Sequence, residues 1–251
     1  MKKVSFLSNQ QTVTGTLHFP ELVKGLPVGR QGKNPAALFI HGWMSNEDGY
    51  YPRAKALTEL GFVCLTINLR GHGTSSGKLQ DYSRKDHVDD SLAAYDFLAS
   101  QTSVDANNIS IVGASYGGYL AAIVAEKRKI TALALRAPAL YPNTDFDKPT
   151  VDLLEDREDE FFQNFEPEID NFALHGVKNV NSLLLIESEL DQIIPHRIIE
   201  LYKNPVKDKT KLTHKIIKEA DHQLSKEGWK QEYIELLKGW FGDVDNFTPT
   251  P

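Results

Sequence analysis

The hydrophobic positions of this chain fall into short blocks, and the spacing within each block predicts a secondary-structure element. Two early runs, near residues 3–7 and 12–19, include a stretch of alternating apolar and polar side chains, the pattern of a strand with one exposed face. Six later runs are mainly apolar, the last of them less cleanly than the others, and short continuous apolar runs are typical of strands buried on both faces of a parallel sheet. These runs are 36–40, 62–67, 109–112, 131–135, 182–186 and 213–217.

Segments with helical spacing separate most of these runs. In one of them, Val88, Leu92, Tyr95 and Leu98 recur three or four residues apart, which places them on one face of a helix. Regular alternation of strands and helices predicts an α/β protein with a mostly parallel, eight-stranded sheet and helices on both faces. The segments expected to be helical are 51–60, 84–100, 117–127, 195–203 and 226–240.

One section of the chain interrupts this alternation. Residues from about 141 to 180 lack a clear period, and 40 residues are too many for a simple connection between a strand and a helix. We interpret this section as a small lid insertion over the carboxyl ends of the strands. With 251 residues and 41% hydrophobic content, residues 1–251 are expected to form a single domain that contains this lid.

Charge is distributed unevenly along the chain. The whole chain carries a net charge of −6, whereas residues 151–170 hold nine acidic side chains and one basic one. An acidic lid would disfavour polyanionic substrates. The alternative is a solvated acidic helix that only keeps the protein soluble. No basic stripe interleaved with aromatic residues is present, so nucleic acid is not expected as a partner.

Several other classes of protein are disfavoured by composition. No apolar run approaches the 18 residues of a membrane span, so no membrane partner is expected. The first six residues lack the apolar run of a signal peptide, and Cys64 is the sole cysteine, so we expect a cytoplasmic protein. No pair of Cys or His residues has metal-ligand spacing. We therefore expect no metal and no cofactor.

The most informative motif is Gly-Ala-Ser-Tyr-Gly at residues 113–117. It stands between the apolar run 109–112 and a helical stretch rich in small residues, so Ser115 lies at the apex of a strand–turn–helix unit. This is the context in which G-x-S-x-G forms a nucleophile elbow, a strained turn that lifts the serine hydroxyl out of the sheet. Glycines are needed there because the turn brings backbone segments close together. Ser115 is therefore the candidate nucleophile.

A serine hydroxyl needs a neighbouring base, which is usually histidine. His222 stands in a polar loop just past the last predicted strand, where such a base is expected. The acid that orients it should follow the run 182–186, where Glu187, Glu189 and Asp191 are all possible by position. We predict Asp191, because Pro195 can begin the next helix and leaves Asp191 in the loop at the strand exit. Glu187 and Glu189 are interpreted as surface charges.

Acyl transfer also requires backbone N–H groups that stabilise a tetrahedral oxyanion. One donor is expected from Tyr116, which follows the nucleophile, and the other from the loop after the run 36–40. In that loop Gly42 would let the chain turn so that the Trp43 N–H faces the site, and His41 is read as a structural polar group.

With these motifs in place, the chain resembles the α/β-hydrolase-fold serine esterases over nearly its full length. The order Ser115, Asp191, His222 is the order these enzymes use. The chain is similar to the cinnamoyl and feruloyl esterases and to small relatives of the acylaminoacyl- and prolyl-peptidase catalytic domains. The matching pieces are 41–43, 70–75, 113–117, Asp191 with Pro195, and 221–222. In the second of these, Arg70 is expected to tie the loop down through its several donors, and His72 is given no chemistry.

This resemblance implies a serine hydrolase that cleaves carboxylic esters of small acyl or aryl acids through an acyl-enzyme on Ser115. Catalytic roles go to Ser115, Asp191 and His222, and the oxyanion hole is formed by the N–H groups of Trp43 and Tyr116. The expected partner is a small-molecule ester, and the expected assembly is a monomer or a homodimer. A thioesterase, a small-peptide or amide hydrolase and a C–C bond hydrolase would use the same triad. A non-catalytic receptor with a hydrolase fold is the alternative from another class.

Overall fold

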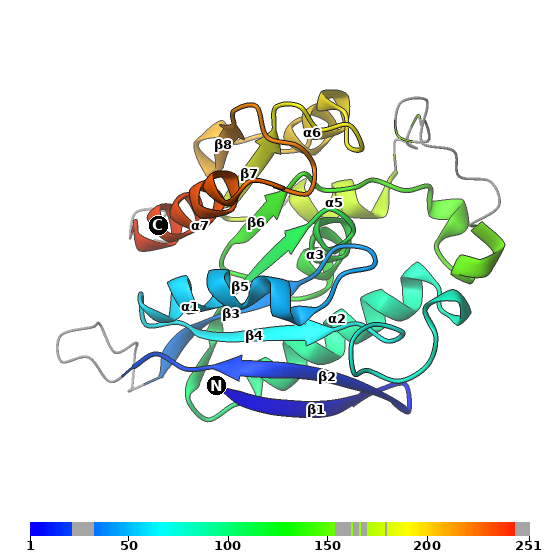
Figure 1. Cartoon of the computed structure of the whole chain (residues 1–251), viewed down its shortest axis with the longest axis vertical. Helices are drawn as coiled ribbons and strands as arrows, with labels where there is room; N and C mark the ends of the chain where they lie inside the picture. The colour runs from blue at the N-terminus through cyan, green and yellow to red at the C-terminus, as the bar shows by residue number, and fades with distance from the viewer. Residues whose placement is uncertain (22–32, 154–161, 163–165, 167–169, 179, 244–251) are drawn as a thin grey trace.

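The computed structural model describes residues 1–21, 33–153, 162, 166, 170–178 and 180–243 (Figure 1). Its centre is one eight-stranded sheet, as the sequence predicts. The strands are β1 (Lys2–Ser8), β2 (Gln11–His18), β3 (Asn34–Ile40), β4 (Val63–Asn68), β5 (Val104–Ala114), β6 (Leu133–Arg136), β7 (Leu183–Ser188) and β8 (Leu212–Ile217).

The order of strands across the sheet is β1-β2-β4-β3-β5-β6-β7-β8. β2 pairs antiparallel with β1 and β4, and all the other pairs are parallel, which confirms the expected mostly parallel sheet. The β1–β2 hairpin turns through Asn9 and Gln10, whose φ angles are 47° and 67°. Two residues with positive φ are what a tight hairpin needs to match the twist of its strands.

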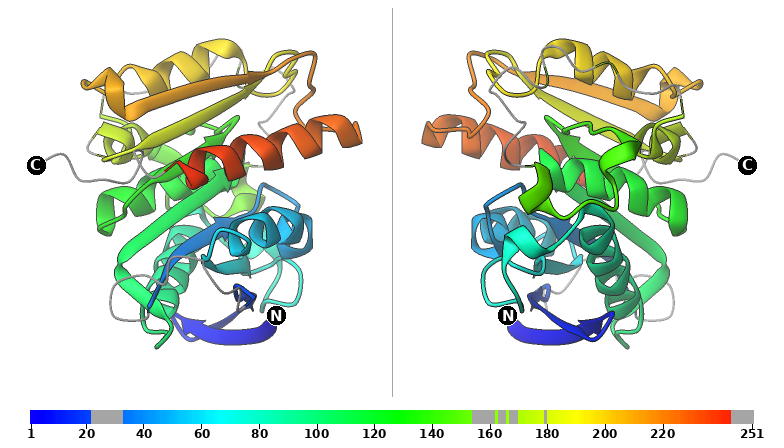
Figure 2. Two further views of the ribbon diagram at one scale, coloured as in Figure 1. Left: turned by 90° about the vertical axis from the view of Figure 1, so that its left-hand side faces the viewer. Right: turned by 90° about the vertical axis from the view of Figure 1, so that its right-hand side faces the viewer.

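Helices cover both faces of the sheet, as expected. They are α1 (Tyr51–Thr58), α2 (Arg84–Ala99), α3 (Tyr116–Lys127), α5 (Phe172–Lys178), α6 (His196–Lys203) and α7 (Glu227–Gly242). The two side views in Figure 2 place α1 and α7 on one side of the sheet and α2 and α3 on the other. Side chains of α5 and α6 belong to the same buried cluster as those of α2 and α3, so these four helices share a face.

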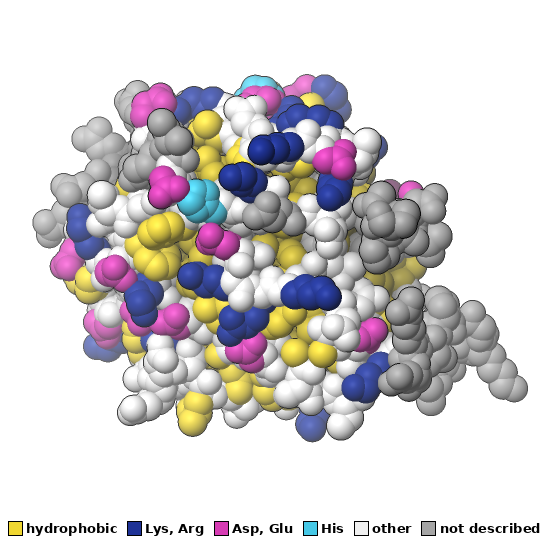
Figure 3. All heavy atoms as spheres, turned by 180° about the vertical axis from the view of Figure 1, so that it is seen from behind, with side chains coloured by type: hydrophobic (Ala, Val, Ile, Leu, Met, Phe, Trp, Pro, Cys, Tyr) yellow, Lys and Arg dark blue, Asp and Glu magenta, His cyan; other side chains and the backbone are white. Residues whose placement is uncertain are grey.

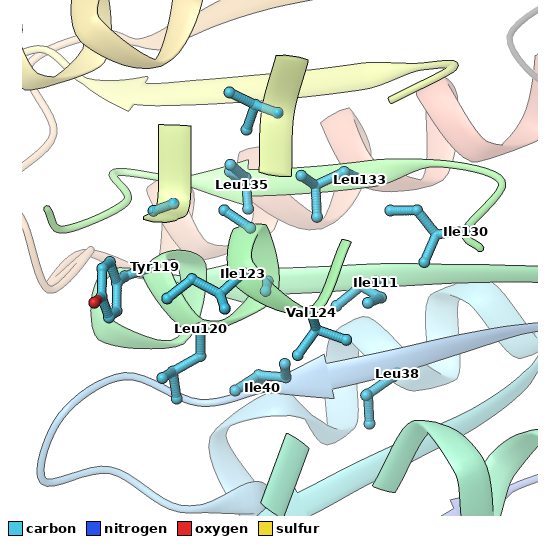
Figure 4. Close-up of a cluster of buried hydrophobic side chains, with 14 of the residues drawn as sticks. Leu38, Ile40, Ile111, Tyr119, Leu120, Ile123, Val124, Ile130, Leu133 and Leu135 are labelled. Carbon is cyan, nitrogen blue, oxygen red and sulfur yellow. The ribbon is translucent and has the colours of Figure 1, made fainter. Parts of the chain in front are cut away.

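Two hydrophobic clusters, one on each face, hold these layers together. Along β3, Leu38 and Ile40 belong to the cluster beneath α2 and α3, whereas Ala37 and Phe39 belong to the cluster beneath α1 and α7. Figure 4 shows Leu38 and Ile40 facing the buried side of α3, near Leu120. Because alternate residues of the central strands are buried on opposite faces, these strands appear in the sequence as continuous apolar runs.

The section from 141 to 180 differs in part from the expected lid. Residues Phe172–Lys178 form α5, which the sequence analysis did not predict. A Cβ at Gly176 would overlap the carbonyl oxygen of Ala122 in α3, so this glycine allows two helices to pack with their backbones almost in contact. α5 is therefore part of the helix layer. Most of the acidic segment 151–170 lies outside the described residues, so the lid insertion at about 141–180 stays a prediction.

The remaining differences concern element ends. β5 begins at Val104, five residues earlier than the apolar run suggests, and β3 begins at Asn34, two residues earlier than the run 36–40. No helix among the described residues is long and apolar enough to cross a bilayer. On the face drawn in Figure 3, Lys and Arg side chains are interspersed with Asp and Glu side chains.

Candidate active site

Ser115 lies at the sharp turn between β5 and α3, with φ 51° and ψ −121°. A non-glycine residue in this region of φ and ψ is strained, and such strain is found mainly at functional sites. The two glycines of the motif make the turn possible. A Cβ at Gly113 would overlap the carbonyl oxygen of Gly117, and a Cβ at Gly117 would overlap that of Ile40 in β3. The nucleophile elbow expected from the sequence therefore has its physical basis in these two close approaches.

The structure brings Ser115, His222 and Asp191 together into one hydrogen-bonded chain. His222 Nε2 lies 3.0 Å from Ser115 Oγ, and His222 Nδ1 lies 2.7 Å from Asp191 Oδ2. The other carboxylate oxygen of Asp191 accepts hydrogen bonds from the backbone N–H groups of Ile193 at 2.9 Å and Ile194 at 2.7 Å. Both carboxylate oxygens are therefore held, and an oriented acid fixes the ring and tautomer of the histidine.

The other two acids that follow β7 lie elsewhere. Glu189 pairs with Lys218 at 2.6 Å, and this contact is the main reason that its pKa is lowered. Glu187 is not the surface charge expected from the sequence, because it is only 6% exposed. It is held between His196 Nδ1 at 2.7 Å and His214 Nε2 at 3.1 Å. The two histidines come from α6 and β8, so a buried carboxylate at this position could not be inferred from the local sequence.

The two backbone groups predicted for the oxyanion hole flank the nucleophile. The Tyr116 N–H is the first of α3, and the first N–H groups of a helix have no partner within it. On the other side, a Cβ at Gly42 would lie 3.6 Å from Ser115 Cβ, so the loop that carries Trp43 passes directly beside the serine. The rings of Trp43 and Tyr116 meet edge to face with centroids 5.0 Å apart, which fixes the two segments relative to each other.

Two buried histidines form hydrogen bonds with the two segments beside Ser115: His41 bonds Gly42, and His87 bonds Tyr116. His41 Nε2 accepts the Leu69 N–H at 3.1 Å, so His41 Nδ1 carries the proton and donates it to the Gly42 carbonyl oxygen at 2.8 Å. His87 bonds the Tyr116 hydroxyl at 2.7 Å through Nδ1. Burial lowers the pKa of both histidines to about 3, so both are neutral near neutral pH. His41 is therefore a structural group, as expected.

Arg70 ties down the loop that follows β4, which confirms the expectation from the sequence. Its side chain donates from Nε to Asp90 Oδ1 at 2.8 Å, from Nη1 to Asp86 at 3.1 Å and from Nη2 to Ser8 Oγ at 2.8 Å. Its backbone N–H also donates to Asp90 Oδ2, at 2.8 Å. Charge-assisted bonds of this kind are the stronger hydrogen bonds in proteins.

Ser115 and His222 open into a cavity of about 1280 Å³. Part of its wall is apolar, with contributions from Trp43, Tyr141 and Phe162. The sequence analysis did not foresee that arginines would also line it: Arg53, Arg84 and Arg136. Of these, only Arg136 left a signal in the sequence, as a charged residue at the carboxyl end of a buried strand, where ligands bind in α/β sheets. Among the described residues, no group of three or more His, Cys, Asp and Glu side chains is placed to hold a metal ion.

Known proteins resemble this chain in sequence and in fold. The model of the prolyl oligopeptidase family (Peptidase_S9) matches residues 49–246. The palmitoyl-protein thioesterase ABHD10 of Rattus norvegicus, a mitochondrial protein, is 32% identical over 130 residues. That match covers 49% of this chain and 41% of the rat protein, so the chain aligns with less than half the length of this relative.

Two solved structures share the fold at low sequence identity. Est1E from Butyrivibrio proteoclasticus, solved with ferulic acid bound, is 17% identical with a TM-score of 0.70, covering 96% of this chain and 97% of that one. The α/β hydrolase domain-containing protein 10 from mouse is 16% identical with a TM-score of 0.70, covering 99% and 100%. The chain thus belongs to the prolyl oligopeptidase family and has the α/β-hydrolase fold.

Proposed function

We propose that this protein hydrolyses carboxylic esters through a covalent acyl-enzyme on Ser115. The observation that carries the proposal is the chain of hydrogen bonds from Ser115 through His222 to Asp191 at the mouth of the cavity. A nucleophile within hydrogen-bond reach of a base, which is itself oriented by an acid, is the arrangement that activates a serine.

In the first half-reaction Ser115 Oγ attacks the ester carbonyl carbon while His222 Nε2 takes the hydroxyl proton. Asp191 stabilises the imidazolium that forms. His222 then returns the proton to the departing alcohol, and the acyl group stays on Ser115. In the second half-reaction a water molecule loses its proton to His222 and attacks the acyl-enzyme, which releases the acid and restores the serine.

The tetrahedral intermediate of each half-reaction carries a negative oxygen. In our proposal this oxygen accepts hydrogen bonds from the backbone N–H groups of Trp43 and Tyr116. Removal of one such donor from an oxyanion hole costs about 2.7–4 kcal/mol in the transition state. The edge-to-face contact of the two rings supports this role, because donors that are already in place need no reorganisation during the reaction.

Thioester hydrolysis is the second candidate, and one specific observation favours it. The rat relative that aligns with 49% of this chain is named a palmitoyl-protein thioesterase. The same triad serves both reactions, since only the leaving atom differs. Peptide or amide hydrolysis is the third candidate, because the chain belongs to the prolyl oligopeptidase family.

A panel of three small substrates separates these candidates: p-nitrophenyl acetate, an acyl-coenzyme A thioester and an aminoacyl p-nitroanilide. We expect kcat/KM to be highest for the aryl ester and Ser115→Ala to reduce it by several orders of magnitude without a change in thermal unfolding. Ser225→Ala is the matched control, since the side chain of this exposed serine bonds Asp221 and the residue lies outside the cavity lining. Full activity of Ser115→Ala would refute the proposal, and a higher value for the thioester would select the second candidate.

A further inference from the structure

Two arginines near the nucleophile differ in their surroundings from Arg70, a buried arginine in the loop after β4. Arg53 belongs to α1, and Arg136 is the last residue of β6. Both line the cavity that holds Ser115. Neither has a carboxylate partner within ion-pair distance among the residues that the structure describes. Arg70, by contrast, pairs with two aspartates.

Arg136 is anchored next to the catalytic serine. Its backbone carbonyl oxygen accepts the Ser115 N–H at 2.9 Å. Its side chain is buried, and within the described part of the chain it makes one hydrogen bond, from Nη1 to Ser188 Oγ at 3.2 Å. A guanidinium group has five N–H donors, so most of the donors of Arg136 have no protein acceptor. Burial lowers the pKa of this arginine, because a charge removed from water is destabilised.

Arg53 is held mainly by aromatic rings. Its guanidinium carbon lies 5.4 Å from the ring centre of Tyr50 and 4.8 Å from that of Tyr233. It also donates one hydrogen bond to the carbonyl oxygen of Gly49. Within the described part of the chain, its Nε is buried without a partner, and so is the hydroxyl of Tyr233. Arg53 in α1 and Tyr233 in α7 both line the cavity, so each lining residue carries one buried donor that this part of the chain leaves unpaired.

The two arginines interact electrostatically with each other and with Tyr50 and Tyr233. The charge of Arg53 helps to lower the pKa of Arg136, as expected for two cations that are close together. Burial raises the pKa of Tyr50 and Tyr233, that of Tyr233 to about 12. The positive charges of both arginines partly offset this rise. Desolvated like charges without an anion destabilise a protein, and a bound anion removes this penalty.

A structural role for Arg136 alone accounts for only part of this arrangement. The negative charge of Asp191 acts to raise the pKa of Arg136, so Arg136 also interacts electrostatically with the triad. That role needs neither the second arginine nor the unpartnered hydroxyl of Tyr233. A ligand with two anionic oxygens would accept from all three groups, since the guanidinium fork matches a carboxylate in geometry.

We propose that Arg53, Arg136 and the Tyr233 hydroxyl form a subsite for a carboxylate carried by the substrate. The preferred substrate is then an ester that bears a free carboxylate on its acyl or its alcohol part. This inference rests on the proposed ester hydrolysis at Ser115. A preference for an anionic substrate is opposite to the effect expected of an acidic lid, which would disfavour polyanionic substrates. The three described acids of that segment, Asp152, Glu166 and Asp170, do not line the cavity. Glu166 pairs with Arg197, and Asp170 pairs with His175.

Two matched substrate pairs test the subsite and locate the carboxylate. The first pair is p-nitrophenyl hydrogen adipate and p-nitrophenyl methyl adipate, which differ in a charge on the acyl side. The second is 4-acetoxybenzoate and methyl 4-acetoxybenzoate, which differ on the alcohol side. We expect one pair to show kcat/KM about 10- to 100-fold higher for its anionic member, the range for hydrogen bonds to a charged group. Equal values within both pairs would overturn the inference.

Variants separate recognition of the carboxylate from folding. Arg53→Gln should bring the ratio of the two kcat/KM values close to one. Tyr233→Phe removes a hydroxyl that has no partner, so a purely structural role predicts no effect, whereas the subsite predicts a loss of about tenfold in the ratio. Lys238→Gln, on the same helix as Tyr233 but paired with Glu59 outside the cavity lining, should leave the ratio unchanged. A ratio that Arg53→Gln and Tyr233→Phe leave unchanged would overturn the inference.

A binding measurement keeps the two proposals distinguishable. Calorimetric titration with adipate and with 4-hydroxybenzoate requires no turnover. If one of them binds to the wild type and binding weakens in Arg53→Gln while no ester is hydrolysed, the subsite stands and the proposed function fails. If esters are hydrolysed without preference and neither acid binds, the proposed function stands and the subsite fails.

Discussion

Replacement of Asp191 by asparagine is a sharp probe of the proposed mechanism, because the structure specifies how the new side chain would be oriented. Asp191 Oδ1 accepts two backbone N–H groups, those of Ile193 and Ile194. An asparagine can satisfy both only if its carbonyl oxygen takes the place of Oδ1. Its NH₂ group then occupies the position of Oδ2, 2.7 Å from Nδ1 of His222.

This orientation reverses the tautomer of His222. Two donors cannot face each other, so Nδ1 must become the acceptor and the proton must move to Nε2. A protonated Nε2 cannot take the proton of Ser115. The same substitution in a serine protease triad lowers kcat by about 10⁴, which corresponds to about 5.4 kcal/mol of transition-state stabilisation. We expect a loss of that size for Asp191→Asn, with little change in thermal stability because both backbone hydrogen bonds are kept.

Initial rates with p-nitrophenyl acetate near neutral pH measure this effect, and Glu189→Gln is the matched control. Glu189 is also an acid after β7, but it pairs with Lys218 and lies away from the triad. We expect Glu189→Gln to keep most of the activity. An Asp191→Asn variant that stays within about tenfold of the wild-type kcat would refute the reasoning. So would a greater loss in Glu189→Gln, since it would mean that the orienting acid is a different residue.

Three further predictions concern the scaffold. Gly117→Ala should lower the free energy of unfolding by about 3 kcal/mol, because the new Cβ overlaps a carbonyl oxygen of β3. Gly239→Ala, in open space on α7, should raise it by about 0.5–1 kcal/mol, and urea denaturation measures both. Arg70→Met should lower it by about 3–5 kcal/mol, because Asp90 is left buried without its partner. Stability should fall as pH drops below about 6.5, since His87 has a folded pKa of about 3 and the unfolded chain binds its proton first. Each such histidine contributes about 1.4 kcal/mol per pH unit, and His87→Asn should remove its share of that slope.

Opposite results would be informative in each case. Equal effects of the two glycine substitutions would mean that the close approach at Gly117 is not needed. An Arg70→Met protein as stable as the wild type would mean that the buried ion pair makes no net contribution. A slope of stability against pH that is the same in His87→Asn would show that this histidine is protonated in the folded state.

Much of the fold follows from the sequence because the parallel strands are buried on both faces. The apolar runs of the central strands are short and continuous, and one helix between them carries the regular spacing of Val88 and its neighbours. Ser115, Asp191 and His222 could be placed because each stands shortly after a strand, and the carboxyl ends of parallel strands meet at one edge of the sheet. No arrangement in three dimensions had to be known for that step.

The parts that the sequence did not predict depend on contacts between distant segments. Glu187 is buried because α6 and β8 each bring a histidine to it. Arg53 and Tyr233 meet because the order of strands places α1 and α7 side by side, although 180 residues separate them in the chain. The helix α5 has only seven residues, too few for a periodic pattern, and its Gly176 looks like a helix breaker until its packing against α3 is seen.

Covalent labelling of the serine tests the central claim most directly. A fluorophosphonate reacts only with a serine that a neighbouring base activates, and mass spectrometry of the digested protein locates the adduct. We predict one adduct, on Ser115, which is lost in Ser115→Ala and strongly slowed in His222→Gln. An unlabelled protein would contradict the account and favour a receptor that binds its ligand without hydrolysis. An adduct on a residue other than Ser115 would also contradict the account.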